Sequence, residues 1–265
     1  MSLRQLARVL DAKANTSRRS GNLNESLNCW RDILHLSQSI NHHALLLHFC
    51  IASAIESYAT SGIYRTLPAM DSSQCKALIP VLIEFDRNRV DFDGVRQREM
   101  VWMVKTGGWM NHLGYLMENL EYQGDTNRLE REIYQKDRAI IRLLLIETAA
   151  RAYQLDHGRP PARLNDLVSK YLTAIPNDPF AIDSRAFHYS TTATKFKLWS
   201  VGYDGKDDNG APLPKNEYGG VSPGSEGDLW LEDYFVRDES PKTDPENNAK
   251  AIEASSSSGD QIEEK

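Results

Sequence analysis

The segment from residue 127 to residue 157 contains neither glycine nor proline, so nothing in it interrupts a helix. Its apolar residues recur at helical spacing and keep one side hydrophobic: Ile133, Ile140, Leu144, Ala149 and Tyr153. Gly158, followed by two prolines, is a strong signal for a helix end. The sequence therefore predicts one helix of about 30 residues, about 45 Å long at 1.5 Å per residue.

Residues 1–122 are predicted to form a series of shorter helices. Apolar residues recur every three or four positions, and the turn at 20–22 marks a stop and a restart. Asp71 is the expected N-cap of one helix, which Pro80 is expected to kink or shift. Paired glycines at 107 and 108 are expected to break the chain. The predicted helices cover residues 3–10, 23–37, 44–58, 75–85, 95–105 and 110–122.

Short turns between these helices favour an array that is either irregular or tetratricopeptide-like. Residues 21–34 are similar to a tetratricopeptide repeat helix, although the chain has no regular period of about 34 residues.

Beyond the long helix, the pattern changes to short strands and loops. Residues 164–170 predict a short helix, and the aromatic runs 187–190 and 196–201 predict an antiparallel strand pair. Residues 202–227 predict a long loop, and the polar composition after Arg237 predicts disorder. The expected fold class is α+β, mostly α: a helical array at 1–122, a unit with the long helix and a small sheet at 123–236, and a tail at 237–265.

Charge and cysteine content exclude several classes of protein. With 31 Lys and Arg against 37 Asp and Glu, the net charge of −6 argues against nucleic acid as a partner. Cys29, Cys50 and Cys75 are too few and too widely spaced for a disulfide scaffold or a CxxC zinc pair, and are expected to be free thiols in helix cores. No apolar run reaches the roughly 18–20 residues of a membrane span, although an anchor lost upstream stays open.

Acidic residues crowd the segment from 200 to 233, where eight Asp and Glu stand against Lys206 and Lys215. A hard divalent cation would relieve their repulsion, because Ca²⁺ takes roughly six to eight oxygen ligands from flexible loops. The segment is not an EF-hand, since the two lysines occupy the third and twelfth positions counted from Asp204. The alternative is a solvated acidic loop without an ion.

Four blocks in the second half of the chain carry a family resemblance. They are Tyr153-Gln-Leu-Asp156-His-Gly158-Arg159-Pro-Pro161, Ile175-Pro176-Asn-Asp178-Pro179-Phe180, Leu198-Trp-Ser200-Val-Gly202-Tyr-Asp204-Gly205 and Gly227-Asp228-Leu229-Trp230. In this order they resemble the C-terminal domain of the major pseudopilin of type II secretion systems. The helical block at 1–122 differs from that family, so a pilus subunit is not expected. The whole chain resembles uncharacterised bacterial proteins that join a helical region to such a module.

The resemblance implies a long helix packed on a small antiparallel sheet, with Ca²⁺ in the acidic loop. It implies that the side chains of Asp204 and Asp228 bind the ion. Asp207 and Asp208 are the next candidates for side-chain ligands, and a backbone carbonyl near Leu198 or Ser200 would complete the coordination. It also implies an envelope or secretion-like assembly. The expected place is the cell envelope or the periplasmic side if an N-terminal anchor has been lost, and the cytoplasm otherwise.

Motifs for nucleophilic or nucleotide-dependent catalysis are missing from the sequence, which has no GxSxG, Walker A or GxGxxG. The expected function is therefore non-enzymatic: a structural or protein-interaction protein with a calcium-stabilised loop. One alternative is a metal-dependent hydrolase that uses the acidic loop or the region of His42 and His43.

A second alternative is a helical-repeat scaffold that binds a partner peptide on its helical array. Its groove would lie near Trp102 and Trp109. The preferred prediction for these two residues is that they pack in a core together with Met100, Met103 and Met110.

Overall fold

The computed structural model describes residues 2–215 and 221–235, and from 109 to 127 it describes the backbone alone. The first unit of the chain extends to Phe235, and the predicted tail at 237–265 lies outside the described residues. The elements in order are α1 (Leu3–Arg19), α2 (Leu23–Asn41), α3 (Leu46–Thr66), η1 (Leu67–Ala69), α4 (Ser72–Arg87), α5 (Phe92–His157), η2 (Leu164–Leu167), β1 (His188–Thr191), β2 (Phe196–Trp199) and α6 (Leu231–Tyr234).

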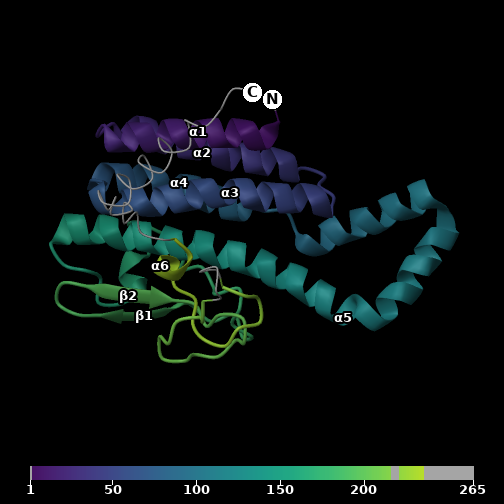
Figure 1. Ribbon diagram of the computed structural model, residues 1–265. Coiled ribbons are helices and arrows are strands. Elements are labelled where there is room, and N and C mark those ends of the chain that lie inside the picture. Colours follow the sequence, from purple (N-terminus) through teal and green to yellow (C-terminus); the bar gives the residue numbers. More distant parts are fainter. Residues whose placement is uncertain (1, 216–220, 236–265) are drawn as a thin grey trace, which may run out of the picture. The chain divides into compact units, whose positions relative to one another are not determined.

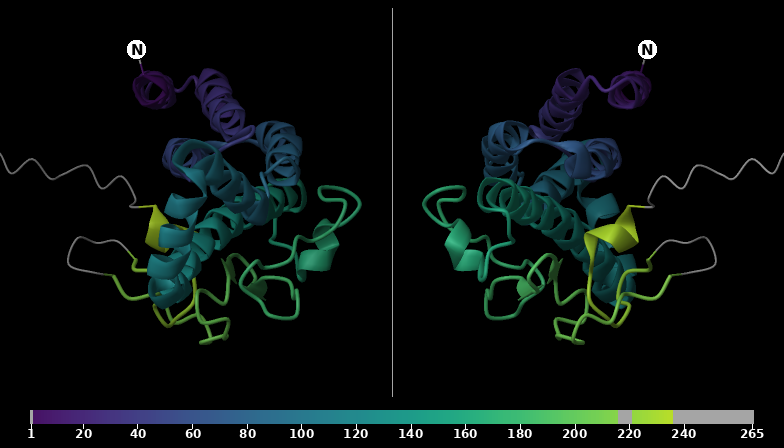
Figure 2. Two further views of the ribbon diagram at one scale, coloured as in Figure 1. Left: turned by 90° about the vertical axis from the view of Figure 1, so that its right-hand side faces the viewer. Right: turned by 90° about the vertical axis from the view of Figure 1, so that its left-hand side faces the viewer.

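The first unit is mostly helical and contains a two-stranded antiparallel sheet, which confirms the coarse fold class. Helix α2 packs between α1 and α3, and α4 packs along α5, with the sheet on the other side of α5 (Figure 1). The end-on views in Figure 2 show the same succession of layers. A tetratricopeptide-like repeat is not confirmed. None of the helices in the described ranges has the length and apolarity needed to cross a membrane.

The predicted helix boundaries in the first half follow local capping chemistry. α1 ends at Arg19, and the Asn22 side chain caps α2 by accepting a hydrogen bond from the Glu25 backbone. Asp71 caps α4 in the same way, accepting from Gln74 N at 2.8 Å. Pro80 lies inside α4, which continues to Arg87. These caps confirm the turn at 20–22 and the predicted role of Asp71.

Helix α3 extends beyond the predicted end at residue 58 and runs through Gly62 to Thr66. The indole of Trp30 on α2 fills the space beside this glycine, and Trp30 is fully buried. A Cβ atom at residue 62 would lie only 2.3 Å from Trp30 Cζ2. Gly62 therefore allows α2 and α3 to approach closely.

The prediction for the middle of the chain was wrong in one respect, because the helices expected at 110–122 and 127–157 are continuous through Gly124. The backbone is helical from Phe92 to His157 apart from Gly108, whose φ of 73° and ψ of 169° interrupt the helix where the glycine pair predicted a break. The predicted domain boundary at 122/123 lies inside α5. Arg96 pairs with Glu130 at 3.0 Å, so the start of α5 lies beside its returning part, and the two parts diverge beyond this contact (Figure 1).

The end of α5 and the sheet match the sequence predictions. Gly158 has a left-handed φ of 72° and donates its N–H to Gln154 O, which closes the helix. His188 pairs with Trp199 in an antiparallel register. The short helix expected at 164–170 is smaller, a 3₁₀ turn that ends at Leu167.

One hydrophobic core runs from α1 through α5 to α6. Within α5 the buried side chains lie on every side of the helix and not on one stripe: Ala139, Ile140, Ile141, Leu143, Leu144, Leu145, Ile146, Ala149, Ala150 and Ala152. A helix that is hydrophobic all round must be covered all round. The N-terminal helices cover one side of α5, and the C-terminal elements cover the other. Of the cysteines, Cys29 and Cys75 are buried as expected, whereas Cys50 is exposed.

The close approach at Gly62 leads to a prediction. We expect Gly62→Ala to lower the free energy of unfolding by about 1–3 kcal/mol, because the new methyl group overlaps the buried Trp30 ring. Gly94→Ala is the matched control, since a Cβ there would come no closer than 3.4 Å to any neighbour. Urea unfolding followed by circular dichroism measures both. Equal stability of the two variants would contradict the proposed packing.

Candidate functional site

Backbone hydrogen bonds hold the acidic loop together beyond the end of β2. Ser200 and Leu229 exchange two N–H···O bonds of 3.0 and 2.9 Å. Asp228 N donates to Ala211 O at 2.7 Å, so the middle of the loop also lies against this pair. Gly202 packs on the same segment with φ of 68°, and a Cβ there would lie 2.2 Å from Gly227 O. Residues 200, 211 and 228 are therefore neighbours although they are far apart in the sequence.

Asp178 is a structural support of this loop to which the sequence analysis gave no role. It is 2% exposed. Its Oδ1 accepts from Ser200 Oγ at 2.8 Å and Phe180 N at 3.0 Å, and its Oδ2 accepts from Val201 N at 2.9 Å. Burial raises the pKa of Asp178, while these donors oppose the rise. Both Ser200 oxygens therefore have hydrogen-bond partners. The hydroxyl donates to Asp178 and accepts from Gly202 N, and the carbonyl accepts from Leu229 N and keeps a second lone pair.

Asp228 is the predicted carboxylate ligand that the fold buries completely. Its Oδ2 accepts from Gly210 N at 2.6 Å, whereas its Oδ1 has no hydrogen-bond partner among the described residues. Desolvation raises the pKa of Asp228. The backbone N–H groups of Gly210 and Asp208 oppose this rise, and the charges of Asp207 and Asp208 add to it. A buried acceptor without a donor costs about 1–3 kcal/mol. This oxygen is thus placed in an environment that favours a positive neighbour.

The other predicted ligands differ in their surroundings. Asp207 accepts from Trp199 Nε1 at 3.1 Å, and its Oδ2 lies 3.1 Å from His188 Nδ1. Asp204 accepts from Lys206 N at 3.1 Å, and Asp208 is exposed. In the described part of the chain, no three His, Cys, Asp or Glu side chains form a group that could hold a metal ion.

The fit to a hard cation rests on Asp228. Its orphaned buried Oδ1 matches the oxygen ligands that Ca²⁺ prefers, and glycines with left-handed φ at 202, 205 and 210 shape the loop around it. A complete shell would need further oxygens from the same loop.

Comparison of the chain with protein-family models, with curated proteins and with solved structures finds no match.

A second set of charged groups lies between α3 and α5, and sequence periodicity gave no signal for it. Glu56 is ion-paired with Arg89, and both side chains are 4% exposed. Asp137 is 7% exposed, accepts from Ser53 Oγ and pairs with Lys136 Nζ at 3.0 Å. Desolvation raises the pKa of Glu56 to about 7 against the opposing charge of Arg89. Such a buried, mixed-charge group is a functional-site candidate.

Glu147 on α5 is another acidic residue that is partly buried. Desolvation, together with the neighbouring Glu232, raises its pKa from 4.5 to about 7. A raised pKa means that the folded state binds the proton more tightly than the unfolded state. The contribution of Glu147 therefore lowers stability progressively as the pH rises from about 4.5 to about 7.

We expect Glu147→Gln to raise the free energy of unfolding by about 1–2 kcal/mol at pH 8 and to have little effect at pH 4.5, because glutamine carries no charge to desolvate. Urea unfolding at both pH values measures the difference. Glu84→Gln on an exposed position of α4 is the control. A gain of the same size at both pH values would rule out the proton-linked explanation.

Proposed function

We propose that this protein is a non-enzymatic structural or protein-interaction protein whose C-terminal acidic loop is stabilised by Ca²⁺. The observation that carries the proposal is the buried Oδ1 of Asp228, which has no partner among the described residues and is surrounded by acidic neighbours. A bound cation would compensate this charge and would favour the folded loop by mass action. Asp204, Asp207, Asp208 and the Ser200 carbonyl are the proposed further ligands.

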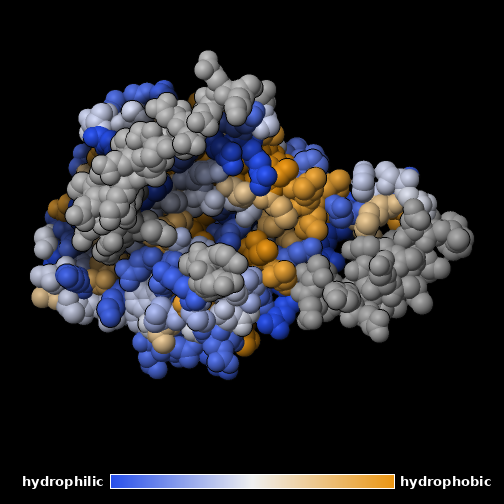
Figure 3. Space-filling model, in the orientation of Figure 1, coloured by the Kyte–Doolittle hydropathy of each residue, from blue (hydrophilic) through white to orange (hydrophobic). Residues whose placement is uncertain are grey.

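The interaction part of the proposal is supported by an exposed apolar run on α5. Met100, Val101, Trp102 and Val104 are 41%, 47%, 50% and 38% exposed. The expectation that Met100 and Trp102 pack in a core was therefore wrong, and the side chains of Trp109 and Met110 lie outside the described residues. Figure 3 shows hydrophobic surface near the place where α5 leaves the helical layers. Large exposed apolar patches mark interaction sites.

Successive residues of a helix point about 100° apart, so the side chains at 100, 101, 102 and 104 spread over about 200° of α5 and leave out the side of Met103, which is half-buried. A partner that wraps around this side of the helix fits such a spread better than a flat contact does. The pseudopilin resemblance of the C-terminal module supports an assembly of the bacterial envelope as the setting for this contact.

The calcium proposal is tested by calorimetric melting of chelator-treated protein. At a free concentration of about 100 Kd, Ca²⁺ adds about 2.7 kcal/mol of stability, which raises Tm by about 5–10 °C. We expect Asp228→Asn to abolish this rise, and Mg²⁺ to give a smaller one. The control Asp183→Asn removes an exposed acid outside the loop and should keep the full rise. Equal rises in wild type and Asp228→Asn would overturn the proposed site.

The interaction proposal is tested by site-specific photocrosslinking in living cells of the source organism. Benzoylphenylalanine replaces Trp102 in one strain and Val9, which is 57% exposed, in a control strain. We expect one discrete protein adduct, identified by mass spectrometry, from position 102 and none from position 9. Identical patterns from the two positions, or no adduct at 102, would contradict a partner surface on α5.

A further inference from the structure

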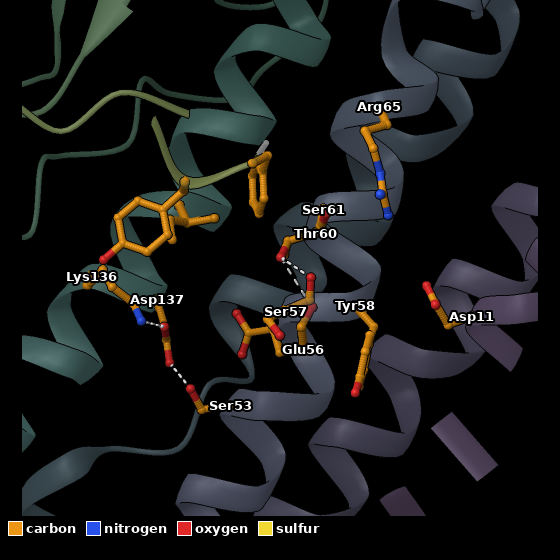
Figure 4. A pocket seen from close by; sticks show the side chains of 13 residues that line it. Asp11, Ser53, Glu56, Ser57, Tyr58, Thr60, Ser61, Arg65, Lys136 and Asp137 are labelled. Atoms are coloured by element: carbon orange, nitrogen blue, oxygen red, sulfur yellow. Dashed lines mark hydrogen bonds and ion pairs between the residues drawn. The ribbon is translucent and has the colours of Figure 1, made fainter. Parts of the chain in front are cut away.

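A cavity of about 450 Å³ lies between α3, α5 and the end of α6, with Asp11 of α1 at its edge (Figure 4). This volume is within the range of about 300–1,000 Å³ that is typical of small-molecule sites. The cavity is separate from the acidic loop and from the exposed run on α5. Ser57, one of its lining residues, is exposed, so solvent can reach it.

One side of the cavity is a row of hydroxyl groups on α3. Ser53, Ser57, Thr60 and Ser61 recur at helical spacing and so share a face of the helix. Ser57 Oγ donates back to Ala54 O at 2.8 Å, and Thr60 Oγ1 donates to Glu56 O at 3.2 Å. Because these protons are used within the helix, the hydroxyl oxygens present acceptor lone pairs.

The charges around the cavity cancel. Asp11, Glu56 and Asp137 supply three negative charges to its wall, and Arg65 and Lys136 supply two positive ones. Arg89, which forms an ion pair with Glu56, supplies the third positive charge, so positive and negative charges are equal in number. A ligand with net charge of either sign therefore gains no overall Coulombic attraction from this wall.

The wall of the cavity nevertheless places hydrogen-bond donors next to acceptors. Lys136 Nζ lies 3.0 Å from Asp137 Oδ1, so an ammonium donor and a carboxylate acceptor are presented side by side. Two adjacent hydroxyl groups of a ligand could donate to the carboxylate and accept from the ammonium.

Aromatic side chains complete the wall at the end of α6. Tyr234 and Phe235 line the cavity. The Tyr234 ring lies under Lys136 Nζ at 5.3 Å, and the Tyr234 hydroxyl lies 3.0 Å from that of Tyr203. Phe235 is 5% exposed and packs on Tyr64, so Tyr234 is the ring that gives the cavity an apolar surface, next to the Lys136 ammonium.

We propose that this cavity binds a small neutral polyhydroxylated ligand, a mono- or disaccharide. Such a ligand uses mixed donors and acceptors without requiring net charge, and it has an apolar ring face for the aromatic wall. The inference concerns a different part of the molecule from the calcium site and does not depend on the proposed function.

Isothermal titration of the full chain tests the proposal with glucose, galactose, N-acetylglucosamine and maltose, and with putrescine and citrate as charged probes. We expect at least one sugar to bind with a Kd in the millimolar range or tighter, and neither charged probe to bind more strongly than that sugar. Preference for putrescine or citrate, or no binding by any of the four sugars, would overturn the proposal.

A matched pair of variants tests whether the sugar binds in this cavity. Ser57→Trp fills the entrance of the cavity from an exposed position and should weaken sugar binding at least tenfold. Ser39→Trp is the control, because Ser39 on α2 is also exposed and also donates its hydroxyl to its own helix. Circular dichroism establishes that both variants fold. If Ser57→Trp binds the sugar as well as Ser39→Trp does, the cavity is not the site.

Discussion

The described structure depends on burial of the α5 segment from Ala139 to Ala152, whose apolar side chains face in all directions. The N-terminal helices cover one side of this segment, and η2, β2 and α6 cover the other. Arg142 reinforces the junction, since it pairs with Asp86 of α4 at 2.9 Å and donates to Asn177 O at 2.7 Å. Neither half can be removed without exposing one side of α5 to water.

The acidic loop is held by both apolar and polar contacts. Val201, Leu213 and Leu229 lie in the main hydrophobic core. The buried Asp178 carboxylate binds Ser200 and Val201, and backbone pairing ties Leu229, next to Asp228, to Ser200. Desolvation raises the pKa of Asp178 and of Asp228. This arrangement makes the loop sensitive to any cation that Asp228 can bind.

The cavity between α3 and α5 shows a different use of buried polarity. Its charged groups are paired, as in the Glu56–Arg89 and Asp137–Lys136 contacts, so the wall is polar without a net field. The acidic loop, by contrast, concentrates one sign of charge. This difference in charge is why we propose different ligands for the two places, a cation at the loop and a neutral hydroxylated molecule in the cavity.

Local sequence signals determined the helix caps at Asn22 and Asp71, the stop at Gly158 and the strand pair, because capping, left-handed glycine and alternating apolar residues act within a few positions. The metal site in the acidic loop stays a prediction from the sequence. Only the tertiary structure decided that Asp228 is buried while Asp208 is exposed, that α5 continues through Gly124, and that Ser53 and Asp137 meet 84 positions apart. Those outcomes depend on which elements pack together, and packing between distant segments leaves no periodic trace in the chain itself.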